Sequence, residues 1–138
     1  MKSISVAAAI IKNGRGEILI CQRAKGGSMG GLWEFPGGKL EEGETLNECI
    51  VRECKEELDI AIEPISVFAN TEYQYPDRFI KFTFFNVRIL SGTIQRKVHD
   101  DIKWISRERL NDYEFCPADV EIISQLKFNK KNDIICVR

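Results

Sequence analysis

The sequence predicts a single domain of the α+β class, residues 1–138, in which strands outnumber helices. Its length of 138 residues suits one compact domain with its own hydrophobic core. Short β-branched and aromatic runs, separated by turns that contain glycine or proline, predict the strands. Two segments with apolar residues at helical spacing, 45–58 and 117–128, predict the helices. No repeat, linker or low-complexity segment divides the chain.

The first elements in chain order are strands. Residues 5–11 and 18–23 are mostly apolar and rich in β-branched residues, and the turn sequence NGRGE between them predicts a first hairpin. The glycine-rich segment 24–31 lacks the spacing of a phosphate-binding loop, so it predicts a flexible loop. Residues 32–35 predict a short strand that ends before a proline.

The rest of the chain contains two helices and three further strands. Thr45 is a good N-cap with Glu48 as its capping-box partner, so we expect a helix that begins there and ends near Leu58. The later elements predicted are strands at 65–75 and 79–90 joined by a turn at 76–78, a strand at 102–106, a helical turn at 107–110, a helix at 117–128 with Pro117 in its first turn, and a turn followed by a strand or tail at 129–138.

Composition excludes several classes of function. The formal net charge of -1 is unlike the positive surface with which proteins bind DNA or RNA, although it permits a single nucleotide as ligand. No segment approaches the roughly 20 apolar residues of a membrane helix. The N-terminal apolar run is short for a signal peptide, and the hairpin explains it better. We therefore expect a cytoplasmic protein.

The cysteines agree with a reducing compartment. Their number is odd, they form no C-x-x-C pair, and four of the five lie in apolar patterns. We expect free, buried thiols rather than disulfides. The five are Cys21, Cys49, Cys54, Cys116 and Cys136.

The expected helix at 45–58 carries an unusual arrangement of acids. On a helical wheel its apolar stripe consists of Leu46, Ile50, Val51, Cys54 and Leu58. Glu53, Glu56 and Glu57 share one arc beside this stripe, whereas solvated acids would lie opposite it. Like charges about 4 Å apart repel by about 1 kcal/mol in water and about 4 kcal/mol at an effective dielectric constant of 20. Three carboxylates on one arc therefore require positive charge nearby to offset their mutual repulsion.

Two interpretations of this arc fit the helix alone. A divalent cation would compensate all three carboxylates, and oxygen ligands favour Mg²⁺, with Mn²⁺ as a substitute. Alternatively, the acids belong to a charged surface helix, in which Arg52 and Glu56 have the spacing of an ion pair. The preceding loop favours the cation, because Gly37, Gly38 and Gly43 allow backbone to approach a ligand closely.

The stretch from Gly38 to Ile60 resembles the signature of the Nudix hydrolases, G-x5-E-x7-R-E-U-x-E-E-x-G-U with U aliphatic. Its charged positions all match: Glu44, Arg52, Glu53, Glu56 and Glu57. Two positions depart. Cys54 replaces an aliphatic residue, which is a mild change because buried cysteine behaves as a small hydrophobe. Asp59 replaces the glycine that ends the helix, and aspartate tolerates the left-handed conformation better than most residues.

The similarity extends to about residue 126 and indicates the MutT-like branch, which hydrolyses nucleoside triphosphates to monophosphate and pyrophosphate. The resemblance implies the Nudix fold, an α/β/α sandwich with a mixed β-sheet between helices. The segments that carry it are QRA at 22–24, LWEFPGGK at 32–39, EYQYPDR at 72–78, IKWIS at 102–106 and CPAD at 116–119.

The resemblance also implies roles for individual residues. The implied ligands of Mg²⁺, or of Mn²⁺ in its place, are Glu53, Glu56, Glu57 and the carbonyl of Gly37. Glu53 is the first candidate for the catalytic base. Arg52 would pair with a carboxylate and hold it in place, and Glu44 would assist with water.

One acid of this branch is absent. Relatives carry a further metal-binding acid six residues before the tryptophan that corresponds to Trp104, and here that position is Val98. His99, Asp100 and Asp101 follow directly, and one of them could take its place. An aspartate suits Mg²⁺ better, because hard cations prefer oxygen. The alternative for His99 is an ordinary loop or structural histidine.

The nucleotide end of the site is expected to combine cations and aromatic rings. Arg23 could reach the ribose or a phosphate, and Phe35 lies beside the expected base pocket. Tyr75 and Phe79 could line this pocket, with ordinary packing as the alternative. The full set of expected substrate-binding residues is Arg23, Phe35, Gly37, Gly38, Lys39, Arg78 and Asp119.

Asp119 stands where an 8-oxoguanine-specific relative would carry an asparagine. An amide donates and accepts hydrogen bonds, whereas an ionised aspartate only accepts. Asp119 therefore favours a base edge with an amino group, as in cytosine or adenine. Guanine would require a different edge or a protonated Asp119. The alternative is an acid at a helix N-terminus without a ligand.

The leading hypothesis is Mg²⁺-dependent hydrolysis of (deoxy)nucleoside triphosphates, including modified ones of the 8-oxo-dGTP, CTP or methylated dCTP type, for nucleotide-pool sanitation. A Nudix hydrolase of a nucleotide sugar or dinucleotide is the runner-up. A non-catalytic nucleotide-binding module is the third hypothesis, and the complete set of signature acids argues against it. The expected partner is a small nucleotide, with no nucleic acid polymer or membrane, and the expected state is a monomer or homodimer.

Overall fold

The computed structural model describes residues 2–128, so the predicted end at 129–138 lies outside the described residues. The elements, in chain order, are β1 (Lys2–Ile11), β2 (Ile18–Gln22), β3 (Trp33–Glu34), β4 (Gly37–Lys39), α1 (Leu46–Leu58), β5 (Ala61–Gln74), β6 (Arg78–Ser91), β7 (Asp101–Ile105), the 3-10 helix η1 (Arg107–Asp112) and α2 (Pro117–Phe128).

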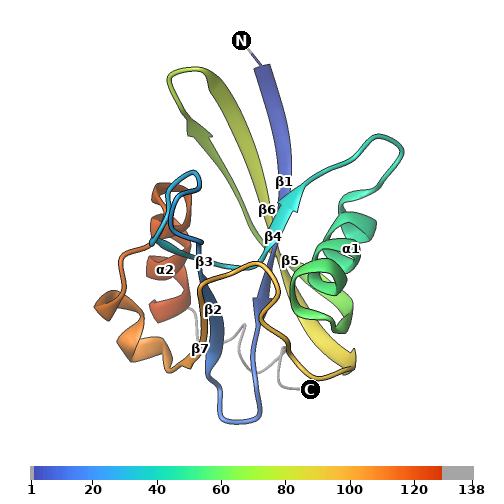
Figure 1. Cartoon of the computed structure of the whole chain (residues 1–138), viewed down its shortest axis with the longest axis vertical. Coiled ribbons are helices and arrows are strands. Elements are labelled where there is room, and N and C mark those ends of the chain that lie inside the picture. Colours follow the sequence, from blue (N-terminus) through green and yellow to red (C-terminus); the bar gives the residue numbers. More distant parts are fainter. Residues whose placement is uncertain (1, 129–138) are drawn as a thin grey trace.

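The strands form two sheets (Figure 1). The larger has the order β4-β1-β6-β5, in which β1 is parallel to β6 and the other pairs are antiparallel. The smaller is antiparallel, with the order β3-β2-β7. α1 and α2 lie on opposite sides of β1 and belong to separate hydrophobic clusters. The predicted α+β class, with a mixed sheet between helices, is confirmed.

β1 supplies both hydrophobic clusters because side chains alternate along a strand. Ala7, Ala9 and Ile11 pack in the cluster that contains α1, whereas Ala8 and Ile10 pack in the cluster that contains α2. All five are buried. The continuous apolar run of β1 is therefore that of a strand covered on both faces.

The prediction of a first hairpin is wrong in its pairing, because β1 and β2 enter different sheets. The turn itself forms, with Asn13 Oδ1 accepting hydrogen bonds from the backbone N–H groups of Arg15 and Glu17. Among the described residues, one isolated bridge between Lys12 and Ile18 joins the two segments. β1 pairs instead with β6 along its whole length, which local turn chemistry cannot predict.

β4 was expected to be part of a loop and is a short strand. Gly37, Gly38 and Lys39 pair antiparallel with Ala8, Ala7 and Val6 of β1. Glycine disfavours strands, so the local pattern predicted a loop. The small side chains of β1 allow the close approach, and the pairing places the start of the signature at the edge of the larger sheet.

α1 begins and ends as predicted. Thr45 Oγ1 accepts from the Glu48 N–H at 3.1 Å, and the Glu48 carboxylate accepts from the Thr45 N–H at 2.9 Å, which completes the capping box. The apolar stripe differs from the prediction at two positions, since Cys49 is fully buried and Val51 is 38% exposed. The stripe is turned toward Cys49 because α1 packs against β4 as well as β1.

Asp59 ends α1 in the left-handed conformation, as predicted, with φ 58° and ψ 39°. Its backbone N–H donates to the Lys55 carbonyl at 3.1 Å, and its carboxylate lies 3.0 Å from Lys55 Nζ. The lysine one turn earlier thus helps an aspartate to occupy a position at which glycine would be unstrained.

The later elements match their predictions closely. β5 begins at Ala61, earlier than predicted, and contains Pro64, which an edge strand tolerates. The turn that joins β5 to β6 lies at 75–77, one residue earlier than predicted, and η1 and α2 form at their predicted places. Within residues 2–128, no helix is both long and apolar enough to cross a membrane. Four cysteines in this range are free and buried, as predicted.

Candidate active site

Arg52 gathers the acids of α1 into one charged cluster. Its Nε and Nη2 donate to the two oxygens of Glu44. Its Nη1 lies 3.1 Å from Glu53 Oε2 and 3.2 Å from Glu56 Oε1. Nη2 also donates to the Lys39 carbonyl at 3.1 Å, which ties α1 to β4. Arg52 therefore contacts three signature acids and the strand beside them.

Glu57 is the acid least compensated in this cluster. Its side chain is 14% exposed, and Oε1 is buried with no hydrogen-bond partner among the described residues. Burial, followed by the neighbouring carboxyls of Glu53 and Glu34, raises the pKa of Glu57 to about 9, against the lowering effect of a backbone hydrogen bond from Gly37. The site therefore holds more carboxylate than its own cations neutralise.

A divalent cation fits this donor set. A positive ion beside the orphaned Oε1 of Glu57 would favour its ionised form and so offset the burial and the repulsion that raise its pKa. Glu56 differs, because its side chain is 58% exposed and bonded to Arg52. Within the described part of the chain, no three acid, histidine or cysteine side chains stand together as a metal-ligand group. The ligand set of Glu53, Glu56, Glu57 and Gly37 stays a prediction.

Gly37 and Gly38 allow β1 and α1 to approach β4 from two directions. A Cβ atom on Gly37 would lie 2.0 Å from the carbonyl oxygen of Ala7, inside the sheet. A Cβ atom on Gly38 would lie 2.3 Å from Glu53 Oε2. Both distances are too short for a contact between non-bonded atoms. The Glu53 carboxylate therefore packs directly against the backbone of β4.

In protein kept free of divalent cations, Glu57→Gln is expected to raise the melting temperature at neutral and alkaline pH. Because the pKa of Glu57 is raised from 4.5 to about 9 on folding, its contribution to stability is complete below 4.5 and is lost as the pH rises toward 9. Glutamine removes this dependence. Calorimetry at several pH values in the presence of a chelator measures the difference.

We expect a divalent cation to stabilise the wild type, and the same variant should lose this stabilisation. Glu42→Gln is the matched control, because Glu42 is an exposed acid of the same signature, and it should change neither quantity. If Glu57→Gln melts at a lower temperature than the wild type throughout this pH range, ionisation of the buried Glu57 carboxyl does not destabilise the fold as argued.

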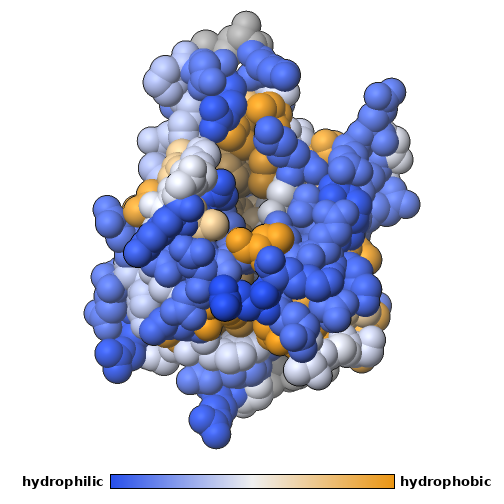
Figure 2. Space-filling model, in the orientation of Figure 1, coloured by the Kyte–Doolittle hydropathy of each residue, from blue (hydrophilic) through white to orange (hydrophobic). Residues whose placement is uncertain are grey.

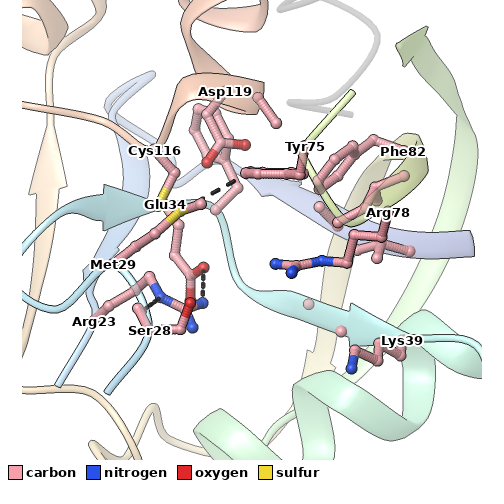
Figure 3. A pocket seen from close by; sticks show the side chains of 17 residues that line it. Arg23, Ser28, Met29, Glu34, Lys39, Tyr75, Arg78, Phe82, Cys116 and Asp119 are labelled. Carbon is pink, nitrogen blue, oxygen red and sulfur yellow. Dashed lines mark hydrogen bonds and ion pairs between the residues drawn. The ribbon is translucent and has the colours of Figure 1, made fainter. Parts of the chain in front are cut away.

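A cavity opens beside the acid cluster, and Figure 3 shows the side chains that line it. All seven residues expected to bind substrate contribute to its lining: Arg23, Phe35, Gly37, Gly38, Lys39, Arg78 and Asp119. Tyr75 lines it too, whereas Phe79 does not. The space-filling view shows apolar residues in a hollow with hydrophilic residues around it (Figure 2). The sequence thus selected residues that the fold brings together.

The cavity wall combines aromatic, cationic and apolar groups. The guanidinium carbon of Arg78 lies 4.7 Å from the centroid of the Tyr75 ring, in a cation–π contact. The Tyr75 hydroxyl lies 3.9 Å from the sulfur of Met29. Phe35 is 3% exposed and meets Phe84 of the core edge-on. Such a wall suits a flat ring that carries polar edges.

Asp119, in the first turn of α2, is the most buried acid of the cavity, with 5% of its surface exposed. Its carboxyl is turned toward the cavity (Figure 3), and no described residue donates a hydrogen bond to it. Burial and, less strongly, the charge of Glu34 raise its pKa well above the ordinary value, against the opposing effect of Arg23. A protonated carboxyl both donates and accepts, as an amide does.

Glu34 was not singled out from the sequence. Its Oε1 accepts from Arg23 Nη1 at 2.9 Å, drawn as a dashed line in Figure 3, and its Oε2 lies 2.9 Å from His99 Nε2. The available signal was an acid between the aromatic residues Trp33 and Phe35, both of which are buried. A carboxylate between two buried aromatic side chains requires hydrogen-bond or ion-pair partners. The sequence alone does not say which residues these are.

His99 reaches the acid cluster from the segment before β7. It is 5% exposed, and its Nε2 lies 3.8 Å from Glu57 Oε1. Asp100 and Asp101 instead accept hydrogen bonds from backbone N–H groups, and Val98 is 54% exposed. Each aspartate is thus engaged by a backbone N–H group, and which of the three residues takes the place of the missing acid stays a prediction.

Comparison with known proteins gives matches in sequence and structure. A family model described as the NUDIX domain matches residues 7–125. The 8-oxo-dGTP diphosphatase of Escherichia coli (strain K12) is 39% identical over 127 residues, which is 92% of this chain and 98% of that protein. The CTP pyrophosphohydrolase of the same strain is 37% identical over 123 residues, covering 89% of this chain and 90% of that protein. The solution structure of the E. coli ORF135 protein matches with a TM-score of 0.78 at 35% identity, covering 90% of this chain and 88% of that one.

Proposed function

This chain belongs to the Nudix family, and we propose that it is an enzyme that hydrolyses nucleoside triphosphates to monophosphate and pyrophosphate. The proposed substrates are ribo- and deoxynucleoside triphosphates, including CTP and modified nucleotides of the 8-oxo-dGTP or methylated dCTP type. Removal of the modified nucleotides would serve nucleotide-pool sanitation. Support comes from the two curated relatives, an 8-oxo-dGTP diphosphatase and a CTP pyrophosphohydrolase, which match over most of their length.

One observation carries the proposal: the base-sized cavity and the acid cluster share a wall. Glu34 and Gly37 line the cavity that contains Asp119, and they also line an adjoining cavity that contains Glu57 and His99. A nucleotide whose base enters the first cavity would therefore extend its phosphates toward the acids. This arrangement supports cleavage within the phosphate chain rather than at the base.

We propose Mg²⁺ as the cation, with Mn²⁺ as a substitute. The residues that would hold it are Glu53, Glu56, Glu57 and the carbonyl of Gly37. When bound, the cation neutralises phosphate charge and makes water a better nucleophile.

The remaining tasks belong to the side chains. Glu53 would accept a proton from water as the water oxygen bonds to a substrate phosphorus and the bond to pyrophosphate breaks. Arg52 holds Glu53 in place through the 3.1 Å contact and is itself fixed by Glu44. Lys39 and Arg78, which line the cavity, would attract the phosphates.

The base would be read by Asp119. The restriction to bases with an amino group applies to an ionised aspartate, whereas burial raises the pKa of Asp119 and so shifts its equilibrium toward the neutral carboxyl. A neutral carboxyl can accept from an amino group or an N–H and donate to a ring nitrogen or a carbonyl. Both cytosine and 8-oxoguanine therefore remain compatible with this residue.

Asp119→Ala is expected to lower kcat/KM by about 10- to 100-fold, mainly through KM, because the base loses a buried partner worth about 1–3 kcal/mol. Asp119→Asn should retain activity, because its amide mimics the protonated carboxyl. As the pH rises through the raised pKa of Asp119, wild-type kcat/KM should fall relative to that of Asp119→Asn. Steady-state kinetics over a range of pH measures the ratio. An asparagine variant as impaired as the alanine variant would show that the ionised form is needed.

A hydrolysis panel tests the proposed activity. Ordinary, 8-oxo and methylated NTPs and dNTPs, together with ADP-ribose, are incubated with Mg²⁺ and the products are identified. Monophosphate with pyrophosphate is the expected result. AMP with ribose phosphate would support a Nudix hydrolase of nucleotide sugars or dinucleotides instead. Binding without turnover of any compound would support a non-catalytic module.

A further inference from the structure

His99 stands between the two parts of the site. Its side chain is 3% exposed, with Nε2 2.9 Å from Glu34 Oε2 and 3.8 Å from Glu57 Oε1. Nδ1 is buried and has no hydrogen-bond partner among the described residues. The ring therefore joins an acid of the cavity wall to the least compensated acid of the cluster.

The contact with Glu34 determines which nitrogen carries a proton. Glu34 already accepts from Arg23 on its other oxygen, and a carboxylate only accepts, so Nε2 must donate. A ring nitrogen that carries a proton cannot bind a cation. In this arrangement, Nε2, which is the ring nitrogen nearest Glu57, does not serve as a metal ligand.

We propose that His99 is a positioning residue of the metal centre. By donating a hydrogen bond to Glu34, His99 keeps this carboxylate at a fixed place beside Glu57. The same N–H group, at Nε2, also lies near Oε1 of Glu57, which has no hydrogen-bond partner among the described residues. Hydrogen bonds around metal ligands fix their orientation in this way. The inference rests on the proposed function, because it assigns His99 to the cation site of that function.

The chain of contacts beyond Glu34 shows what the bond restrains. Arg23 donates through Nη1 to Glu34 and through Nε to the Ser28 carbonyl, at 2.9 and 2.8 Å. Without His99, the hydrogen-bond partner that remains to the Glu34 side chain within residues 2–128 is Arg23, which lines the cavity. Glu34 would then be drawn away from the acid cluster, and the place beside Glu57 would lose its ordered neighbour.

Mn²⁺ binding to the nucleotide-free protein, measured by isothermal titration calorimetry, tests the inference without turnover. His99→Phe keeps a ring of similar shape but removes the donor, and it is expected to weaken Mn²⁺ binding by about 10- to 100-fold. His99→Gln places an amide nitrogen near the position of Nε2 and should restore most of the affinity. His99→Asn, whose amide is too short to reach Glu34, should not.

Asp112→Asn is the control. It removes the exposed contact with Arg109 Nε at 3.2 Å on η1, no residue of which lines either cavity, and it should leave Mn²⁺ affinity unchanged. Unchanged affinity in His99→Phe, or a His99→Gln protein as weak as His99→Asn, would overturn the inference. If the wild type itself binds no Mn²⁺, the proposed cation site is wrong, and the role of His99 falls with it. If the wild type binds Mn²⁺ and the His99 variants bind it equally well, only the role of His99 is wrong. Should His99→Phe not fold, the comparison of glutamine with asparagine decides.

Discussion

Glu53→Gln is expected to lower kcat by several orders of magnitude while the protein stays folded. Glutamine keeps the size of the side chain and an oxygen that can accept from Arg52 Nη1, now at 3.1 Å. It can neither take a proton from water nor supply a negative charge to a cation. General base catalysis alone contributes about 10²- to 10⁴-fold, and loss of a metal ligand adds to this. Pre-steady-state turnover of the best substrate from the hydrolysis panel measures the loss.

Glu42→Gln is the control for this result, and Glu56→Gln is a second test of the cation site. Glu42 is exposed in the same signature, so its variant should match the wild type. Glu56 is largely exposed and bonded to Arg52, so its substitution tests whether it joins the cation site during turnover. Activity of Glu53→Gln near that of the wild type would refute the role assigned to Glu53.

Gly37→Ala is expected to destabilise the fold by more than about 3 kcal/mol, because the added Cβ would lie 2.0 Å from a backbone oxygen of β1 and 2.7 Å from the Cα atom of Ala8. Neither atom belongs to a flexible side chain, so β4 must separate from β1. Urea denaturation, or the yield of soluble protein, measures the effect.

Gly38→Ala provides a contrast on the neighbouring residue. There the added Cβ meets the Glu53 carboxyl, which is a side chain and can move, so activity should fall much more than stability. Gly14→Ala is the neutral control, because its Cβ would have no atom within 4 Å. Equal stability losses in Gly37→Ala and Gly14→Ala would contradict the tight pairing of β4 with β1.

Local features of the site could be predicted because their causes are local. The capping box of Thr45, the end of α1 and the left-handed Asp59 each depend on residues within one or two turns of helix. The spacing of the signature acids on α1 likewise fixed their common side. The resemblance then selected Arg23, Arg78 and other residues that line one cavity.

Features that depend on distant pairing could not be predicted. β4 is a strand because the small side chains of Ala7 and Ala8 in β1 allow its backbone to pair there. β1 in turn pairs with β6 rather than with β2, the next strand in the sequence. Glu34 and His99 are 65 positions apart, and neither has a local pattern that names the other. Long-range register decides such contacts, and a single sequence carries little information about it.

The division of the site between elements has a consequence for its history. The proposed reacting groups stand on β4 and α1, whereas part of the wall of the cavity proposed for the base comes from the loop at 24–31, the turn between β5 and β6 and the start of α2. Loops and element ends tolerate replacement far better than paired strands. A lineage built on this scaffold can therefore exchange one nucleobase preference for another by small surface changes while the phosphate chemistry is inherited intact.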